Sequence, residues 1–401
     1  MISFALFSHV LPPSSSGQAI VLHRLLSALP PESYYVITTD DLAHRDTPGY
    51  VGDASERLPV EEVSLPARHR ISGDPASRLR RLVRLGKAWL AIRRRARDVA
   101  ALLRRKRIRT LVACTAGDFV DLPACWLAAR RCGVRFIPYY FDDYFYQWSG
   151  YGRSVLAYAR SWEPRFIRGS TGIVVPNEFL RDELRARYGV EATVVHNPVE
   201  DHFLEERGDA PWPASPPSIR VVYTGAVYAA HFDAFRNLLG ALGSPSAAGT
   251  KLHIYTAQPL GELEAAGIAG RLEVHGHVPH TEVREVQRGA DILFLPLAFN
   301  SPYPDIIRTA SPGKLGEYLA SGRPILAHAP ADSFVTWYVK EHRCGLVVDT
   351  PEPARIADAL ERLRRDADLR RDLVARATER AQRDFARPVA AEAFSKLLGA
   401  G

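Results

Sequence analysis

Short apolar runs alternate with helical patterns along the whole chain. Apolar runs of about four to eight residues predict buried strands, and apolar residues at three- and four-residue spacing predict amphipathic helices. The strands expected in the first half are residues 2–7, 34–39, 110–114, 134–141 and 172–175. The helices expected between several of them are residues 18–29, 123–131 and 178–188. This alternation predicts an α/β fold with a mainly parallel sheet and helices on both faces.

The pattern breaks at residues 205–218, where four of fourteen residues are proline, as in a stiff linker. Beyond it, strands are expected at residues 219–224, 251–256, 271–275, 291–295, 324–328 and 345–349. We therefore predict two tandem Rossmann-like doubly wound domains, residues 1–204 and 219–385. The end of the chain is helical by period, Pro388 interrupts it, and residues 386–401 are expected to pack back on the first domain.

Composition is consistent with this organisation. A chain of 401 residues is too long for a single domain with one hydrophobic core. Its content of 46% hydrophobic and 24% charged residues is that of a folded globular protein and excludes wholesale disorder. The longest apolar run, residues 292–299, is far shorter than the roughly 20 residues that cross a bilayer. No basic residue precedes the apolar start, which therefore predicts a strand rather than a signal peptide. The four cysteines include no C-x-x-C pair, which argues against a disulfide framework or structural zinc, and we expect a cytoplasmic protein.

Positive charge is concentrated in one segment. The net charge is +7, yet residues 78–109 hold fourteen Lys or Arg and a single acid, Asp98, so the rest of the chain is acidic. Apolar residues at helical spacing predict one basic amphipathic helix. This helix either continues through Gly86 or is broken near it. Its apolar stripe either packs on its own domain or docks on an anionic membrane surface. Nucleic acid is a weaker alternative, because Trp89 is the only aromatic residue in the segment.

The strongest candidate site is a helix expected after Ser311. Ser311 has the position of an N-cap, Pro312 that of the first helical residue and Gly322 that of the stop, so three turns are predicted. The helix follows a long loop, residues 296–310, that carries Asn300, Asp305 and Arg308. Lys314 in the first turn opposes the helix dipole, which favours an anion at this end.

Glu317 lies three residues after Lys314, on the same helix face. One interpretation is an ion pair between them, which contributes about 0.2–0.5 kcal/mol. In the interpretation we favour, Lys314 and the backbone amides of Gly313 to Leu315 hold a diphosphate, and Glu317 accepts hydrogen bonds from ribose hydroxyls.

Two loops of the first domain also follow strands. Residues 8–17 lead into a helix whose free N–H groups favour an anion, with Gly17 permitting close approach and Ser16 and His9 nearby. A plain turn with a serine N-cap explains this loop equally well.

The second loop, residues 141–148, combines aromatic residues with Asp142 and Asp143, which suits a sugar. Either carboxylate could orient an attacking hydroxyl. Equally, Asp142 could be a helix N-cap and the aromatic residues core. The pair is not good evidence for a metal site, since no third ligand can be placed.

Several blocks resemble the retaining glycosyltransferases of the GT-B fold, in the broad family 4 group. The block of residues 311–324, preceded by residues 289–296, is similar to the donor-nucleotide signature of that family. Four other blocks match in order the end of the first domain, the turn before the linker, the opening of the second domain and the segment that meets the base: residues 174–180, 196–199, 221–225 and 274–278.

The resemblance implies that the first domain binds an acceptor and the second a nucleotide-diphosphate sugar, without a cofactor or metal, because basic groups and helix dipoles neutralise the diphosphate. The donor nucleotide is then expected to meet Gly225, His277, Val278, Ser311, Gly313, Lys314, Leu315 and Glu317. The expected catalytic residues are Asp142, Asp143, Arg308 and Lys314, and the phosphate or acceptor loop holds His9, Ser16 and Gly17.

This sequence departs from the family pattern at two places. Thr309 stands where the family commonly has a second glutamate that touches the donor sugar. The loop after Gly225 lacks the usual Arg and Lys that meet the diphosphate, and we expect Arg308, Lys314 and His231 to replace them.

We therefore predict a glycosyltransferase of hexosyltransferase type that transfers a sugar to a hydroxyl with retention. The basic helix suggests a lipid-linked or cell-surface glycan as acceptor, polysaccharide biosynthesis as the process and the inner face of the membrane as the location. The alternatives are a GT-B sugar-nucleotide epimerase and a nucleic-acid-binding protein that uses residues 78–109.

Overall fold

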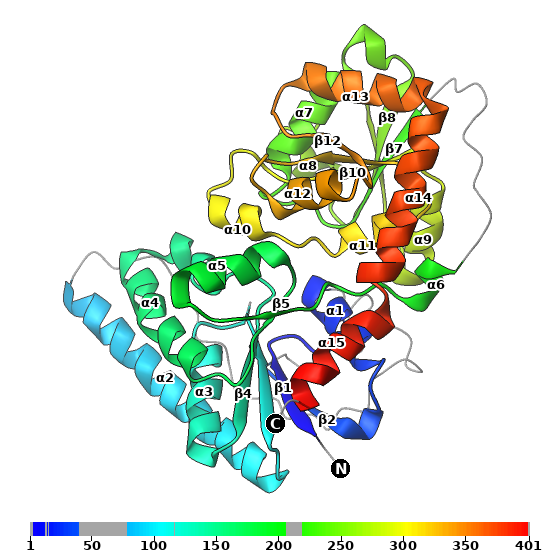
Figure 1. The fold of residues 1–401 in the computed structure, drawn as a ribbon. Helices are drawn as coiled ribbons and strands as arrows, with labels where there is room; N and C mark the ends of the chain where they lie inside the picture. The colour runs from blue at the N-terminus through cyan, green and yellow to red at the C-terminus, as the bar shows by residue number, and fades with distance from the viewer. Residues whose placement is uncertain are drawn as a thin grey trace. The chain divides into compact units, whose positions relative to one another are not determined.

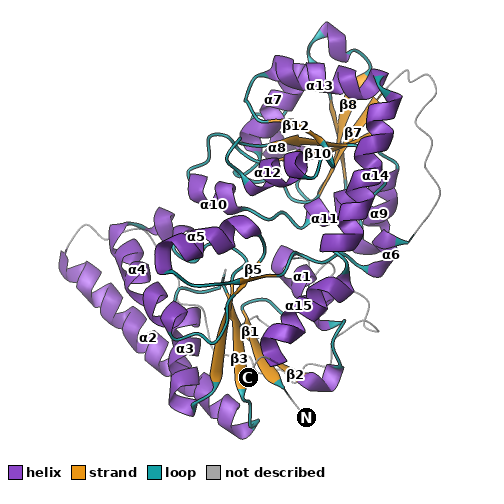
Figure 2. Ribbon diagram, in the orientation of Figure 1, coloured by secondary structure: helices purple, strands orange, loops and turns teal. Residues whose placement is uncertain are grey.

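The chain forms two compact units. The computed structural model describes residues 3–12, 14, 16–39, 78–115, 117–205 and 219–399. Unit 1 comprises Met1–Pro198 and Arg387–Gly401, and unit 2 comprises Val199–Ala386. Each unit has a parallel sheet flanked by helices, which confirms the predicted α/β class with two doubly wound sheets (Figures 1 and 2). The predicted linker lies, apart from Glu205, outside the described residues.

The sheet of unit 1 has the strand order β2-β1-β3-β4-β5-β6, and every neighbouring pair is parallel. Its strands are β1 (Phe4–Ser8), β2 (Tyr34–Thr38), β3 (Thr110–Cys114), β4 (Arg135–Tyr139), β5 (Val174–Val175) and β6 (Thr193–Val194). Adjacent strand residues enter opposite cores, since Leu111 packs on one face and Val112 on the other. The strand order reverses between β1 and β3, where ligands bind in such folds.

Helices cover both faces of this sheet. They are α1 (Gly17–Leu26), α2 (Arg78–Arg105), α3 (Asp121–Cys132), α4 (Arg153–Arg168), α5 (Glu178–Tyr188) and α15 (Arg387–Gly399). The last helix of the chain, α15, joins the core of unit 1: the Phe394 ring meets the Phe4 ring edge-on at 5.6 Å. Arg135 also holds α15 on this unit, because it donates hydrogen bonds to the carbonyls of Leu397 and Leu398 at 3.0 and 2.6 Å.

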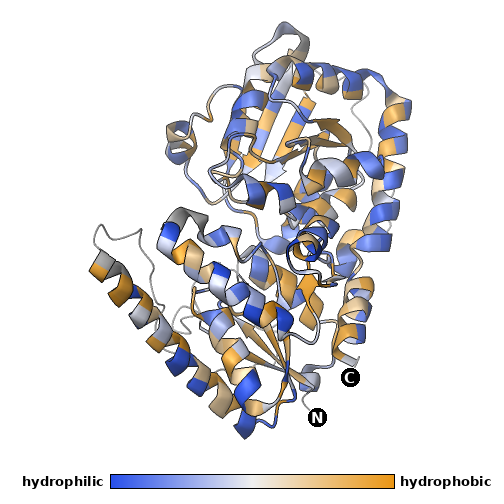
Figure 3. Ribbon diagram, turned by 60° about the vertical axis from the view of Figure 1, so that its left-hand side comes forward, coloured by the Kyte–Doolittle hydropathy of each residue, from blue (hydrophilic) through white to orange (hydrophobic). Residues whose placement is uncertain are grey.

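Helix α2 lies along the outer side of unit 1, beside α3 and α4 (Figure 1). It runs unbroken through Gly86, so the break considered there does not occur. Figure 3 shows hydrophobic and hydrophilic segments alternating along it. Its second half packs into the core through Ile92, Ala96, Val99 and Leu103. Its first half leaves large apolar side chains exposed: Leu79, Leu82, Val83, Trp89 and Leu90.

The sheet of unit 2 has the order β12-β11-β10-β7-β8-β9, again with parallel pairs throughout. Its strands are β7 (Ile219–Thr224), β8 (Thr250–Tyr255), β9 (Leu272–His275), β10 (Ile292–Pro296), β11 (Ile325–His328) and β12 (Leu346–Val348). The order reverses between β7 and β10, so the loops that follow these two strands flank the switch point where ligands bind in this fold.

The helices of unit 2 are α6 (Asp201–Leu204), α7 (Phe232–Leu242), α8 (Leu260–Ala265), α9 (His280–Arg288), α10 (Pro304–Thr309), α11 (Lys314–Leu319), α12 (Phe334–Glu341), α13 (Pro353–Arg365) and α14 (Ala367–Asp384). The expected long loop at residues 296–310 was wrong in part, because α10 forms inside it.

The expected three-turn helix after Ser311 was also wrong in length. Helix α11 begins at Lys314 with Gly313 as N-cap, because the Pro312 carbonyl accepts the Leu315 N–H in a preceding turn. It ends at Leu319, where the Ser321 hydroxyl donates to the Tyr318 carbonyl at 2.7 Å.

In the parts of the chain that the structure describes, no helix has both the length and the apolar character needed to pass through a membrane.

Candidate functional site

Lys314 and Gly225 meet at the C-terminal end of β7, within unit 2. A Cβ added to Gly225 would lie 3.0 Å from both Cε and Nζ of Lys314. Gly225 has φ +112°, a conformation that favours glycine. The Lys314 ammonium lies 4.9 Å from the centre of the Tyr223 ring, in cation–π contact. The structure therefore brings two predicted donor-site residues together at the switch point of the sheet.

Side chains behind Lys314 hold α11 against this strand end. The Tyr318 hydroxyl accepts a hydrogen bond from the Thr224 backbone N–H at 3.2 Å, which ties α11 to the last residue of β7. Gly316 packs so closely that an added Cβ would lie 2.8 Å from atoms of both Val199 and Phe385. The backbone of α11, from which the Lys314 side chain extends, is thus held in place by the contacts of Gly316 and Tyr318.

Glu317 is buried on the same helix but contacts other groups. Gln287 donates to Glu317 Oε2 at 3.0 Å and to the Thr224 hydroxyl at 3.2 Å. His280 Nε2 lies 3.9 Å from Glu317 Oε1. These contacts do not include the Lys314 ion pair considered from the sequence. Neither Gln287 nor His280 is predicted from the sequence, because nothing in the residue pattern of α9 distinguishes polar side chains that face Glu317 from exposed ones.

His231 is buried beside this group. Its Nδ1 lies 3.5 Å from the Tyr223 hydroxyl. Burial, reinforced by the positive charge of Lys314, lowers the pKa of His231 from 6.5 to about 3. The imidazole is therefore neutral at pH 7, and it can donate one N–H to a phosphate oxygen but cannot replace a missing cation.

Three further predicted site residues, Arg308, Ser311 and Gly313, precede α11 in the sequence. Arg308 is half-buried on α10. Ser311 and Gly313 are half-buried between α10 and α11. The Leu315 amide is bonded to the Pro312 carbonyl at 3.0 Å, so it is not available to a diphosphate as expected. Thr309, at the position of the family's second glutamate, bonds back to the Asp305 carbonyl at 3.2 Å.

His277 and Val278 lie in the loop between β9 and α9, where His277 is exposed and Val278 half-buried. Because the strands of unit 2 are parallel, the loops after β7, β9 and β10 open at the same edge of the sheet. The predicted donor residues therefore share one edge.

In unit 1 the two predicted acceptor carboxylates differ sharply. Asp143 is fully buried, and its Oδ1 accepts the N–H groups of Phe145 and Tyr146 at 2.9 and 3.1 Å while its Oδ2 pairs with Arg187. Burial raises the pKa of Asp143, although Arg187 opposes the shift. Asp143 therefore holds this loop in place. The N-cap role considered for Asp142 does not occur, because the short 3₁₀ helix Tyr146–Tyr151 has Phe145 as its N-cap.

Three of the aromatic residues in this loop, Tyr144, Phe145 and Trp148, are core, as in the alternative interpretation, whereas Phe141 and Tyr146 are half-buried. Tyr144 and Trp148 are buried, with ring centres 6.2 Å apart. Asp142 is a half-buried residue, and burial together with the charge of Asp143 raises its pKa. Of the two aspartates, Asp142 is the less buried.

A buried network that the sequence did not reveal lies behind Asp143. Arg187 also pairs with Glu163 at 3.2 Å. The hydroxyls of Tyr140 and Tyr188 donate to Glu163 at 3.0 and 2.6 Å. Burial, with the charge of Asp143, raises the pKa of Glu163 to about 7. This network joins β4, α4 and α5, and it is structural in character.

The loop after β1 contains the expected serine cap. The Ser16 hydroxyl accepts the Ala19 N–H at 3.2 Å, and the exposed Gly17 begins α1. His9 is half-buried, and a Cβ added to Gly117 would lie 3.2 Å from the His9 Cβ. The loops after β1 and β3 are therefore adjacent at the switch point of unit 1.

Two tandem doubly wound units form the architecture of the GT-B fold. Each half of the chain matches a family model: Glycosyltransferase Family 4 over residues 15–203 and Glycosyl transferases group 1 over residues 218–366. The chain belongs to the family 4-like group of GT-B glycosyltransferases. The resemblance stated from the sequence is confirmed, as is the prediction of a glycosyltransferase enzyme.

Solved structures share this fold at low identity. A glycosyltransferase from Rickettsia africae ESF-5 is 12% identical, with a TM-score of 0.66 and 99% of both chains covered. Sucrose-phosphate synthase from Thermosynechococcus elongatus is 15% identical, with a TM-score of 0.67, 98% of this chain and 97% of its own covered. Anabaena HepE in complex with UDP-glucose is 12% identical, with a TM-score of 0.66 and 99% of both chains covered. None of the curated proteins matches this sequence.

Proposed function

We propose that this enzyme binds a nucleotide-diphosphate sugar in unit 2 and transfers the sugar, with retention, to a hydroxyl of a glycan or lipid-linked acceptor. The observation that carries the donor site is the contact of Lys314 with Gly225 at the switch point of the sheet. A cation beside a glycine that leaves the backbone open is suited to a diphosphate. Retention is supported by the family alone.

Lys314 would stabilise the negative charge that develops on the leaving nucleoside diphosphate. Arg308, on the preceding helix, is the second candidate cation. Glu317 would accept hydrogen bonds from the ribose hydroxyls, because Gln287 and His280 already hold its carboxylate in one orientation. His277, Val278, Ser311 and Gly313 would complete the contacts to the nucleotide.

UDP is the first nucleotide to test, because HepE, which shares the fold, was solved with UDP-glucose. Calorimetric titration with UDP, GDP, dTDP and ADP should give binding of one of them to the wild-type protein. Leaving Mg²⁺ out should not change that binding, because no metal is expected in the diphosphate site. Glu317→Ala should weaken it about tenfold or more, since a hydrogen bond to a charged group contributes about 1.5–3 kcal/mol.

The matched control is Glu264→Ala, which removes an exposed carboxylate from α8 and should bind as the wild type does. If no nucleotide binds, or if Glu317→Ala binds as tightly as the control variant, the donor site is wrongly placed. A circular-dichroism melt of each variant separates lost binding from lost folding.

In unit 1 we assign the acceptor to the loops after β1 and β4. Asp142, a half-buried residue with a raised carboxyl pKa in the loop after β4, is suited to accept a hydrogen bond from an acceptor hydroxyl. His9, Ser16 and Gly17 offer polar groups and an exposed helix start at the switch point of the same sheet.

The first half of α2 favours an acceptor presented at an anionic membrane surface. Leu79, Leu82 and Leu90 are 71%, 67% and 61% exposed at helical spacing. The surrounding helix is rich in arginine. Apolar side chains that enter the lipid interface and cations that meet anionic headgroups would act together there.

Vesicles of equal parts phosphatidylglycerol and phosphatidylcholine should sediment the protein at low salt, and phosphatidylcholine alone should not. Replacing Leu82 and Leu90 together by serine should weaken vesicle binding at least about tenfold. Burial of one leucine side chain in the lipid interface contributes about 1.5–3 kcal/mol to the free energy of binding. The exposed Leu260→Ser on α8 is the control. Duplex DNA that binds as well as the vesicles, with no effect of the leucine variants, would select the nucleic-acid alternative.

A further inference from the structure

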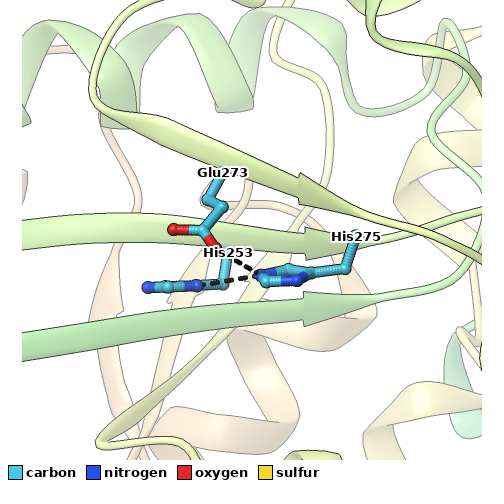
Figure 4. A group of neighbouring side chains, drawn as sticks. All are labelled: His253, Glu273 and His275. Carbon is cyan, nitrogen blue, oxygen red and sulfur yellow. Dashed lines mark hydrogen bonds and ion pairs between the residues drawn. The ribbon is translucent and has the colours of Figure 1, made fainter.

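Two histidines and a glutamate meet on the edge strand β9 and its neighbour β8 in the unit 2 sheet (Figure 4). His253 lies on β8, and Glu273 and His275 lie on β9. Within the described residues, one ligand atom from each lies within 4.8 Å of the other two. His253 Nδ1 and His275 Nε2 are 3.0 Å apart, and Glu273 Oε1 is 3.8 Å from His275 Nε2.

The strand register explains why these three side chains share one face. Val222, His253 and Glu273 form one row across the sheet, and the next row with the same orientation contains Thr224, Tyr255 and His275. The opposite face of β8 carries Leu252 and Ile254, which belong to the hydrophobic core. The cluster therefore lies on the face away from that core.

Neighbouring groups already orient two of the three candidate ligands, His275 and Glu273. The Tyr255 ring stacks on the His275 ring at 4.2 Å and 11°, and Arg220 donates to the Tyr255 hydroxyl at 3.1 Å. Lys251 binds Glu273 Oε2 at 2.8 Å, which leaves Oε1 turned toward His275. Outer contacts of this kind hold metal ligands in position in known sites.

We propose that His253, Glu273 and His275 form a binding site for a divalent transition-metal ion of the zinc type. Two imidazole nitrogens and one carboxylate oxygen are a ligand set of catalytic and regulatory zinc sites, and solvent would fill the fourth position. Two nitrogens bound to one tetrahedral zinc lie about 3.3 Å apart, given Zn–N distances of about 2.0–2.1 Å. The observed 3.0 Å separation needs only a small adjustment.

The chemistry of the histidine pair is compatible with this ion. The 3.0 Å hydrogen bond requires one imidazole nitrogen to donate and the other to accept. On metal binding, the donating ring moves its proton to its other nitrogen by exchange with water, and both nitrogens then present lone pairs. No proton is released when both rings start neutral.

The location suggests what the ion would do. His275 lies two strands from Thr224, about 10 Å across the sheet, so the ion would be separate from the position of Lys314. Gly276, His277 and Val278 follow His275 directly, and they form the segment proposed to meet the nucleotide base. An ion on His275 would therefore order the start of that segment. This consequence rests on the proposed function, whereas the metal site itself does not.

Metal binding is tested on the full, tag-free chain. Titration with ZnCl₂ should give one ion per chain, and CoCl₂ should produce the intense visible absorption of tetrahedral cobalt. His253→Ala and His275→Ala should each weaken binding by at least about tenfold. His202→Asn, a partly exposed histidine on α6, is the control and should bind as the wild type does.

Zinc binding that is equal in His253→Ala, His275→Ala and the control, or a cobalt spectrum of octahedral type, would overturn the proposal. Melting curves establish that each variant folds. Nucleotide titration with and without Zn²⁺ then separates the two proposals. Zinc that binds without changing nucleotide affinity removes the link to the base segment and leaves the metal site intact.

Discussion

The Lys314 ammonium lies 4.9 Å from the centre of the Tyr223 ring, and the same side chain occupies the space beside Gly225. Lys314 is the first residue of α11, and Tyr223 is the penultimate residue of β7. The start of a helix and the end of a strand are thus linked by one cation. The aromatic face stabilises this half-buried charge without neutralising it, so Lys314 remains able to attract an anion.

Replacing Lys314 by methionine should weaken binding of the diphosphate more than binding of the nucleoside. The apolar stem can still pack near Tyr223, but the charge is lost. We expect UDP affinity to fall about 10- to 100-fold, corresponding to about 1.5–3 kcal/mol for an interaction with a charged group, while weak uridine binding is unchanged. Lys340→Met, which removes an exposed ammonium paired with Asp349, serves as control in the same calorimetric titrations. Equal losses for UDP and uridine would place Lys314 away from the phosphates.

Alanine at position 225 should damage both folding and donor binding. The backbone there has φ +112°, and the new Cβ would lie 3.0 Å from two atoms of Lys314. Such strain costs about 1–3 kcal/mol, and Lys314 must also move. Thermal unfolding should show a lower Tm, and calorimetry should show weaker UDP binding. Gly261→Ala in α8, where an added Cβ meets no atom within 4 Å, should retain both properties. Unchanged UDP affinity in Gly225→Ala would separate this glycine from the donor site.

The sequence pattern alone predicts much of the fold. Strands β3 and β7 and helix α5 have the predicted bounds, because their apolar periodicity is uninterrupted and turn-forming residues delimit them. The lengths of α10 and α11 were not predictable in the same way. A hydrogen bond from Leu315 to the Pro312 carbonyl delays the start of α11, and capping rules based on residue type do not include such local competition.

Side-chain environment was harder to predict than secondary structure. Asp142 and Asp143 are equivalent in sequence, and the difference between them arises from Arg187, which lies more than forty positions later in the chain. In α2 the apolar stripe continues along the helix, yet Leu79, Leu82 and Leu90 are exposed, whereas Ile92, Ala96 and Val99 are buried in the core. Periodicity predicts an apolar face, and tertiary contacts decide how much of that face is covered.

His231 should make unit 2 less stable as the pH falls. Its pKa is about 3 in the folded protein and 6.5 ordinarily, so the unfolded chain binds a proton there between these values and the folded chain does not. Its contribution to stability is therefore complete above pH 6.5 and is lost as the pH falls toward 3. The slope is about 1.4 kcal/mol for each pH unit, or about 2 kcal/mol between pH 7 and pH 5.

Urea unfolding at pH 7 and pH 5 measures this effect. His231→Phe keeps an aromatic ring beside Tyr223 and removes the titrating group, so the free energy of unfolding should vary less with pH than in the wild type by about 2 kcal/mol. Leu260→Ser, which replaces an exposed residue without a titrating group, should keep the wild-type dependence. An unaltered pH dependence in His231→Phe would mean that His231 is not excluded from water as its burial indicates.

Substitutions of Asp142 and Asp143 should have different effects, the first on sugar transfer and the second on the stability of unit 1. Asp143→Asn removes the charge that faces Arg187 in a buried site and should destabilise unit 1 by about 3 kcal/mol, seen as a lower urea midpoint. Asp142→Asn alters a half-buried residue and should change stability by less than about 1 kcal/mol. If Asp142 orients the acceptor hydroxyl, its variant should lose sugar transfer but retain UDP binding, since the donor site lies in unit 2. Wild-type transfer by Asp142→Asn would exclude that role, and an unchanged urea midpoint in Asp143→Asn would show that its pair with Arg187 does not stabilise the loop.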